Sequence, residues 1–143
     1  PVTEEITGVD LVEWQLLVAS GEPLPKRQDE LSINGHAVEA RLYAEDPAKG
    51  FLPSIGRLEL LELFPEDARI ETGVEQGDVV SPFYDPMIAK VVVHGDNREA
   101  ALDALEFQLS ISRVWPVKSN KGFLVRLLKN ARVRAAELDT GVI

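Results

Sequence analysis

Cysteine is missing from this 143-residue chain, which excludes disulfides, thiolate nucleophiles and thiolate metal ligands. Histidine occurs only at His36 and His94, and no metal-ligand spacing links the two residues. No apolar run approaches the ~20 residues that a membrane-spanning helix needs. The printed residues also show no signal-peptide pattern. These absences argue against a thiol-based site, a metal site and a membrane span, and they fit a cytosolic protein.

Basic residues are also scarce. The chain has 24 acidic and 15 basic residues, a net charge of −9 and no basic cluster, which argues against a broad nucleic-acid surface. The glycines at 50 and 56 lack the lysine and the strand-to-helix setting of a phosphate loop. No serine has the context of a nucleophile elbow. The length and the 45% apolar fraction suit one globular domain. Because the first residue is Pro1, we expect a fragment, a processed product or a deliberately shortened chain.

The residue pattern predicts a helix, several short strands, a helix, a short strand and a last helix. We expect Pro1 to Gly8 to be extended or looping. The first helix should begin at Asp10 and end near Gly21. Its apolar face should carry Leu11, Trp14, Leu17 and Val18. We expect Trp14 to be a packing residue, and the alternative is an exposed recognition tryptophan. Strands are expected at 35–46, 57–63, 69–72, 79–80, 87–94 and 111–117, and further helices at 98–110 and 121–130. Either Asp96 or Asn97 should cap the former helix, and Ser119 or Asn120 the latter.

Short turns between the middle strands imply antiparallel pairing. The predicted fold class is therefore α+β, an antiparallel sheet of short strands packed with helices. The chain is organised around the stretch 35–47, which is expected to be a strand running into a turn. Side chains on a strand alternate between two faces. One face is mostly apolar and should lie on a core, and it carries His36, Val38, Ala40 and Leu42.

The opposite face of this strand carries Ala37, Glu39, Arg41 and Tyr43. It is suited to a ligand or a partner, and the alternative is a solvated face with a Glu39–Arg41 ion pair. Arg41 stands out because a guanidinium stays protonated and offers a planar fork of donors for an oxyanion such as bicarbonate or phosphate. Asp85, in an aromatic loop, could orient Arg41. The alternative for Asp85 is a loop-capping acid that accepts from nearby backbone N–H groups.

Several motifs resemble the biotin carboxylase family. Residues 35–41 (GHAVEAR) with 44–47 (AEDP) are similar to the start of the biotin carboxylase C-terminal domain. Residues 1–11 (PVTEEITGVDL) resemble the family's join between the ATP-grasp domain and this one. The sequence of residues 11–16 and 21–25 is most similar to that of the biotin-carrying α subunits of propionyl-CoA or methylcrotonyl-CoA carboxylases. The likeness continues in order through the whole chain, in 51–54, Gly56, Tyr84-Asp85, Met87-Ile88, Lys90, Val117-Lys118, Asn120 and Phe123-Leu124.

The resemblance implies that residues 1–30 are the terminal helix and linker of an ATP-grasp domain, and that 31–143 form the biotin carboxylase C-terminal domain. It implies the first half-reaction of an acyl-CoA carboxylase, in which ATP activates bicarbonate and CO2 passes to a ureido nitrogen of carrier-bound biotin. The cofactors would be biotin and ATP with Mg2+ or Mn2+, bound mainly by an ATP-grasp domain before Pro1. We therefore expect these residues alone to be inactive.

The implied partners are a biotin carboxyl carrier domain and a carboxyltransferase subunit, with a possible homodimer and neither nucleic acid nor membrane. The carboxyltransferase would choose the acyl-CoA, so this sequence does not identify it. The location would be the bacterial cytoplasm or, in a eukaryote, the mitochondrial matrix. Two departures from the family are Trp115-Pro116, where a glycine is usual, and Ser119 in place of threonine.

The resemblance also assigns site residues. Arg41 would lie beside biotin and bicarbonate and stabilise the biotin enolate. From the residue pattern, we expect Asp85 and Glu39 to be further binding residues, and the alternative for Glu39 is a surface acid. Asp139 and Thr140 would fall near the adenine pocket. Two other functions stay open, a non-catalytic dimerisation or carrier-docking module and a related ATP-grasp ligase domain of the carbamoyl phosphate synthetase type. Arg41 and the loop around Asp85 favour the biotin carboxylase over the latter.

Overall fold

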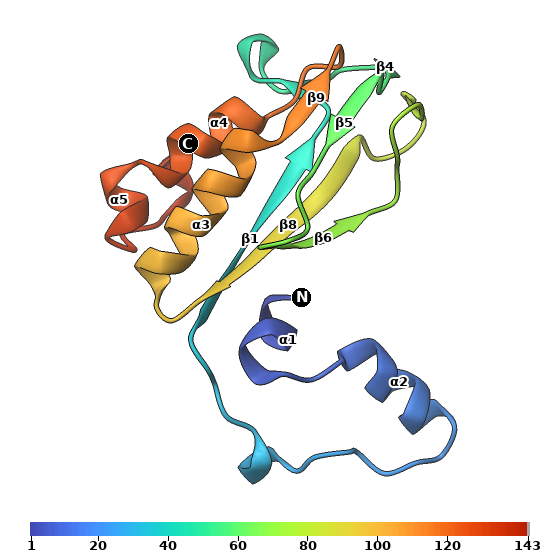
Figure 1. Ribbon diagram of the computed structural model, residues 1–143, viewed down its shortest axis with the longest axis vertical. Helices are drawn as coiled ribbons and strands as arrows, with labels where there is room; N and C mark the ends of the chain where they lie inside the picture. Colours follow the sequence, from blue (N-terminus) through green and yellow to red (C-terminus); the bar gives the residue numbers. More distant parts are fainter. Residues whose placement is uncertain (143) are drawn as a thin grey trace.

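The computed structural model describes the backbone of residues 1–142 (Figure 1). The helices are α1 (Val2–Thr7), α2 (Leu11–Ala19), α3 (Arg98–Ile111), α4 (Lys121–Leu128) and α5 (Ala131–Arg134). The longer strands are β1 (His36–Tyr43), β6 (Arg69–Thr72) and β8 (Met87–Gly95). The short strands are β2 (Glu45–Asp46), β3 (Leu52–Pro53), β4 (Gly56–Arg57), β5 (Leu60–Glu62), β7 (Val79–Val80) and β9 (Arg113–Trp115). Three-residue 3-10 turns occupy Gln28–Glu30, Pro47–Lys49 and Thr140–Val142.

A three-stranded sheet with the order β1-β8-β6 forms the centre of the fold. Both pairings are antiparallel, and three further antiparallel pairs join β2 to β3, β4 to β7 and β5 to β9. The α+β prediction is therefore confirmed, although the strand expected at 57–63 is divided into β4 and β5. None of the helices within residues 1–142 is long and apolar enough to cross a bilayer.

Helix α3 packs against one face of the sheet, and α4 and α5 follow on the same side (Figure 1). This face is apolar because alternate residues of β1 and β8, among them Ala40, Val91 and Val93, point toward Leu102 and Leu105 of α3. Burying each such leucine contributes about 1.5–3 kcal/mol. A second cluster around Leu42, Leu58 and Ile88 lies beneath the shorter strands. The apolar face predicted for β1 is thus confirmed.

The first eight residues were expected to be extended, and this prediction was wrong, because residues 2–7 form helix α1. Tertiary contacts stabilise this short helix on the opposite face of the sheet from α3. Arg69 of β6 pairs with Glu4 and Glu5 at 2.7 and 3.3 Å, and the Asn34 N–H donates to Ile6 O at 2.8 Å. A six-residue helix has little intrinsic stability, so local sequence alone did not reveal it.

Helix α2 has the predicted ends. The Asp10 carboxylate accepts from the N–H groups of Val12 and Glu13, and Gly21 follows the helix with a φ of 93°. None of its residues is buried within the described part of the chain, and Trp14, which was expected to pack, is half-buried. Instead Leu11, Trp14 and Leu24 help to line an open groove of about 660 Å³.

The C-terminal third follows the predicted order with small differences. Asn97 caps α3 by accepting from the Ala100 N–H at 3.0 Å. The strand expected at 111–117 is limited to β9, and the Trp115–Pro116 peptide bond is cis. Helix α4 begins after Asn120 as predicted, but the Asn120 side chain makes no cap hydrogen bond. That side chain is directed to β1 instead.

Candidate functional site

Arg41 lies on the face of β1 that points away from α3. Its side chain is 64% exposed, whereas the Glu39 side chain on the same face is 17% exposed. The Arg41 Nε–H donates to Glu39 Oε1 at 3.3 Å, and the same carboxylate raises the pKa of Arg41. The Tyr43 phenol contributes in the same direction. The Glu39–Arg41 pair predicted from alternation is present, and its guanidinium is accessible to a ligand.

The backbone that carries Arg41 is held at a β-bulge. The register between β1 and β8 shifts between Leu42 and Tyr43, so the ladder is interrupted there. Asn120 fills this gap. Its Oδ1 accepts from the Tyr43 N–H at 2.9 Å, its Nδ2 donates to Arg41 O at 3.1 Å, and its own N–H donates to Tyr43 O at 3.1 Å. One residue from the start of α4 thereby fixes the end of β1 beside Arg41.

Sequence reasoning missed this role of Asn120 because asparagine before a helix is the usual sign of a cap. The one signal in the sequence was its place among the family-like motifs near residue 117. Burial agrees with the structural role, because Asn120 is 7% exposed and polar. A buried amide that satisfies two backbone groups is the arrangement expected of a specific structural contact.

Asp85 does not contact Arg41 directly among the described hydrogen bonds and ion pairs. Its Oδ1 accepts from the Met87 N–H at 3.0 Å, so the loop-capping alternative is confirmed. Its Oδ2 accepts a long hydrogen bond of 3.5 Å from the Tyr43 hydroxyl. Tyr43 lies on the same face as Arg41. Asp85 is therefore linked to the Arg41 site through the hydroxyl group of Tyr43. Burial, with the Asp85 charge as a second cause, raises the pKa of the neighbouring Glu45.

The loop around Asp85 also presents two aromatic rings. Phe83 and Tyr84 are 87% and 83% exposed. A pocket of about 190 Å³ lies under this loop and is lined by Val80, Tyr84, Asp85 and Met87, among others. The site region therefore combines a fixed positive charge, a phenol and apolar ring surfaces.

Asp139 and Thr140 are not brought to this face. Asp139 follows α5, where it accepts from Arg132 at 2.9 Å and from the Gly141 N–H at 2.8 Å. Helix α5 lies on the helical side of the sheet, opposite Arg41. Thr140 begins the 3-10 turn Thr140–Val142, and its side chain lies outside the described part of the structure. Over residues 1–142, no group of three or more His, Asp or Glu side chains is arranged to hold a metal ion.

A model of the biotin carboxylase C-terminal domain matches residues 39–143. The chain belongs to the biotin carboxylase family. The α subunit of methylcrotonoyl-CoA carboxylase from Rattus norvegicus is 49% identical over 145 residues, which are 100% of this chain and 20% of that protein. The biotin carboxylase of Halalkalibacterium halodurans is 44% identical over 144 residues, covering 100% of this chain and 32% of that protein.

Solved biotin carboxylase structures have the same fold. The biotin carboxylase domain dimer of Hydrogenobacter thermophilus 2-oxoglutarate carboxylase, in complex with MgADP, ADP and bicarbonate, superposes with a TM-score of 0.94 at 38% identity. The superposed region is 98% of this chain and 31% of the Hydrogenobacter thermophilus chain. The resemblance seen in the sequence is confirmed, and the chain spans between a fifth and a third of the length of these relatives.

Proposed function

We propose that this chain is the C-terminal part of a biotin carboxylase that carboxylates carrier-bound biotin with ATP and bicarbonate, as the first half-reaction of an acyl-CoA carboxylase. The observation that carries the proposal is the exposed Arg41 guanidinium in the family-matched strand β1. The relatives support it, since they include carboxylase α subunits and a domain solved with MgADP and bicarbonate.

Arg41 supplies charge and direction in this proposal. Glu39 binds the Nε–H, so the terminal amino groups of the fork remain at the exposed end of the side chain. Such a fork suits the oxygen of a bicarbonate ion or the ureido oxygen of biotin. A fixed positive charge beside an oxygen that becomes negative lowers the barrier of the reaction. Asn120 holds the strand backbone at Arg41 and Tyr43, so the charge is preorganised.

Biotin has an apolar ring system with a polar ureido group, and the residues present fit both parts. We propose that Asp85 helps to bind it through Tyr43, beside the exposed rings of the same loop. Asp139 and Thr140 are proposed to lie toward the nucleotide. ATP and Mg2+ or Mn2+ would be held mainly by an ATP-grasp domain of the longer protein.

We propose that residues 1–30 belong to the end of that ATP-grasp domain and that 31–143 form the C-terminal domain. The exposed apolar groove of α2 supports this division, because another part of a longer chain could cover it. The proposed partners are a biotin carboxyl carrier domain, a carboxyltransferase subunit and a second copy of the chain. The relatives include mitochondrial and bacterial proteins, so the proposed location is the mitochondrial matrix or the bacterial cytoplasm.

The test is Arg41→Ala in the full-length subunit. ATP binding should survive, whereas the rate of biotin carboxylation should fall by ~10²–10³, the usual cost of losing one such donor. Arg113→Ala is the matched control. Arg113 of β9 is about as exposed as Arg41 and forms a 3.1 Å ion pair with Glu62 of β5. A near-normal rate in Arg41→Ala would favour the non-catalytic docking module. Bicarbonate-dependent ATPase activity of the 143-residue chain alone would refute the expected dependence on a further domain.

A further inference from the structure

A band of charged residues crosses the sheet on the Arg41 face. Arg41, Lys90 and Glu71 are direct neighbours across β1, β8 and β6, because Arg41 pairs with Lys90 and Lys90 pairs with Glu71. One step along the strands, Glu39 and Arg69 lie in the next row, on either side of β8. Two of these bases, Arg41 and Lys90, are therefore adjacent, an arrangement that is unfavourable unless acids neutralise them.

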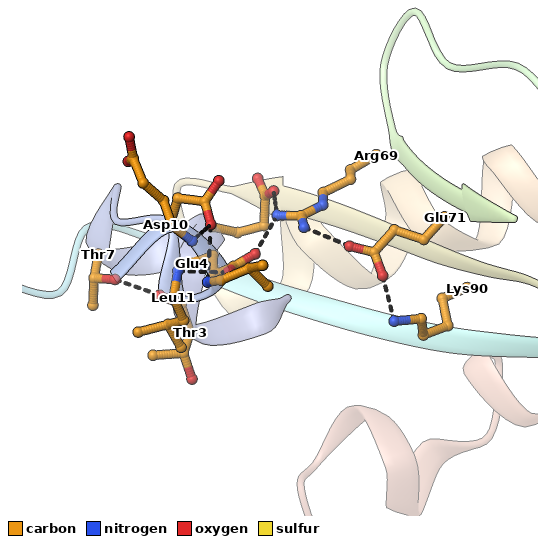
Figure 2. A network of polar contacts seen from close by, with 11 residues as sticks. Thr3, Glu4, Thr7, Asp10, Leu11, Arg69, Glu71 and Lys90 are labelled. Carbon is orange, nitrogen blue, oxygen red and sulfur yellow. Dashed lines mark hydrogen bonds and ion pairs between the residues drawn. The ribbon is translucent and has the colours of Figure 1, made fainter. Parts of the chain in front are cut away.

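Glu71 neutralises Lys90. The two side chains form an ion pair, and the same carboxylate pairs with Arg69 (Figure 2). The hydrogen bond from Lys90 is the largest cause that lowers the pKa of Glu71, followed in effect by Arg69. Both Lys90 and Glu71 are half-buried, so their contact is less screened than a fully exposed pair. Within residues 1–142, Glu71 is the one acid with which Lys90 forms an ion pair.

Arg69 depends on Glu71 much less than Lys90 does. It also pairs with Glu4 at 2.7 Å and with Glu5 at 3.3 Å, and these contacts hold α1 on the sheet (Figure 2). Removing the Glu71 charge would leave Arg69 with two acids and Lys90 with none among the described partners. The effect of such a change should therefore concentrate on Lys90.

Among the acids near Lys90 on its own face, Glu4 and Glu5 already pair with Arg69, whereas Glu39 lies on the neighbouring strand β1. Glu39 pairs across the strands with Val92, so Lys90 occupies a diagonal position relative to Glu39. Diagonal Cβ atoms lie about 7–8 Å apart, a distance that a lysine side chain can span. Lys90 would then compete with Arg41 for the single carboxylate that orients the guanidinium.

We propose that Glu71 is a positioning residue of the Arg41 site, which holds the Lys90 ammonium and so leaves the Glu39 carboxylate to Arg41. This inference rests on the proposed function, because it concerns the orientation of the same arginine. Glu71 itself lies two strands away from Arg41 and acts only through Lys90 and Glu39.

The experiment compares Glu71→Gln, Lys90→Met and the double variant in the full-length subunit, with free biotin as the substrate and kcat and KM measured separately. Glutamine keeps the size of Glu71 and removes its charge. We expect Glu71→Gln to lower kcat/KM for biotin about tenfold through misplacement of Arg41, while the KM for ATP stays unchanged. Adding Lys90→Met should restore kcat/KM to within about twofold, because the competitor for Glu39 is gone. Lys90→Met alone should be near wild type.

The rescue separates positioning from stability, since the weakened Arg69 contact is common to the single and double variants. A double variant as impaired as Glu71→Gln, or a Glu71→Gln variant with normal kinetics, would overturn the inference. A crystal structure of Glu71→Gln gives a second readout that does not depend on activity. The Lys90 ammonium should lie within ion-pair distance of Glu39, and the inference is wrong if it does not. Normal kinetics of Arg41→Ala would refute the proposed role of Arg41, whereas normal kinetics of Glu71→Gln alone would refute only the role of Glu71.

Discussion

Replacing Asn120 with alanine would test how the end of β1 is held. The substitution removes the acceptor of the Tyr43 N–H and the donor to Arg41 O, two contacts of 2.9 and 3.1 Å. The Asn120 N–H to Tyr43 O bond is unaffected, because it belongs to the backbone. The β-bulge offers the two released groups no replacement in the ladder.

The expected loss follows from these two contacts. A partly buried backbone group that loses its partner costs about 1–3 kcal/mol, so two such groups should cost about 2–6 kcal/mol of the free energy of unfolding. Water can reach the half-buried Tyr43, which favours the lower part of this range. Asn120→Asp should lie in between, because a carboxylate can accept from the Tyr43 N–H but cannot donate to Arg41 O.

The assay is urea unfolding of the 143-residue chain, followed by circular dichroism. Asn130→Ala is the matched control, since Asn130 caps α5 through a 2.9 Å contact with the Arg132 N–H and is exposed. Loss of a cap typically costs ~1 kcal/mol. If Asn120→Ala is no more destabilising than Asn130→Ala, the argument that Asn120 holds the site strand is refuted. In the full-length subunit, Asn120→Ala should also reduce biotin carboxylation more than ATP binding.

Two further predictions concern the same face. Gly35→Ala should destabilise the chain by more than ~1 kcal/mol, because φ is +64° and a Cβ would lie 2.4 Å from Gly95 O. Gly50→Ala, at φ +66° in open space, should cost less, and equal urea midpoints would contradict this. The pKa of Glu4 is lowered by the Leu11 N–H and Arg69, and that of Glu71 by Lys90 and Arg69. The ionised forms therefore stabilise the docking of α1 above pH 4.5, and protection of α1 amides from hydrogen exchange should be lost as pH falls below 4.5. If this protection were already lost between pH 7 and 6, ionisation of Glu4 and Glu71 would not be its cause.

Strong local patterns predicted the regular elements well. The expected helix at 98–110 is α3, because a leucine stripe preceded by a cap residue is typical of a helix. The expected strand at 87–94 is β8, because a valine-rich run is typical of a strand. The same alternation placed Arg41 and Glu39 on the face opposite the core. These features are determined by residues that lie close together in the sequence. They could therefore be predicted from the sequence.

Features that depend on distant residues were not predictable. Helix α1 depends on Arg69, more than sixty residues later, and Asn120 contacts β1 from about eighty residues away. Asp85 was open between two roles because both need a loop acid, and its hydrogen bond from the Met87 N–H depends on how the loop folds. The apolar stripe of α2 was recognisable as a stripe, but sequence periodicity does not say what covers it.

The docking of α1 has a consequence for exchanging this module between carboxylases. The family match begins at residue 39, but α1 contacts both β1 and β8 on the face where Ala37 and Val92 are buried. A graft cut at the matched boundary would lack Ala37, expose Val92 to water and leave Arg69 without two of its acids. The segment that matches the family model is thus shorter than the segment that packs as one unit. A chimaera should therefore carry residues 1–38 together with the domain they stabilise.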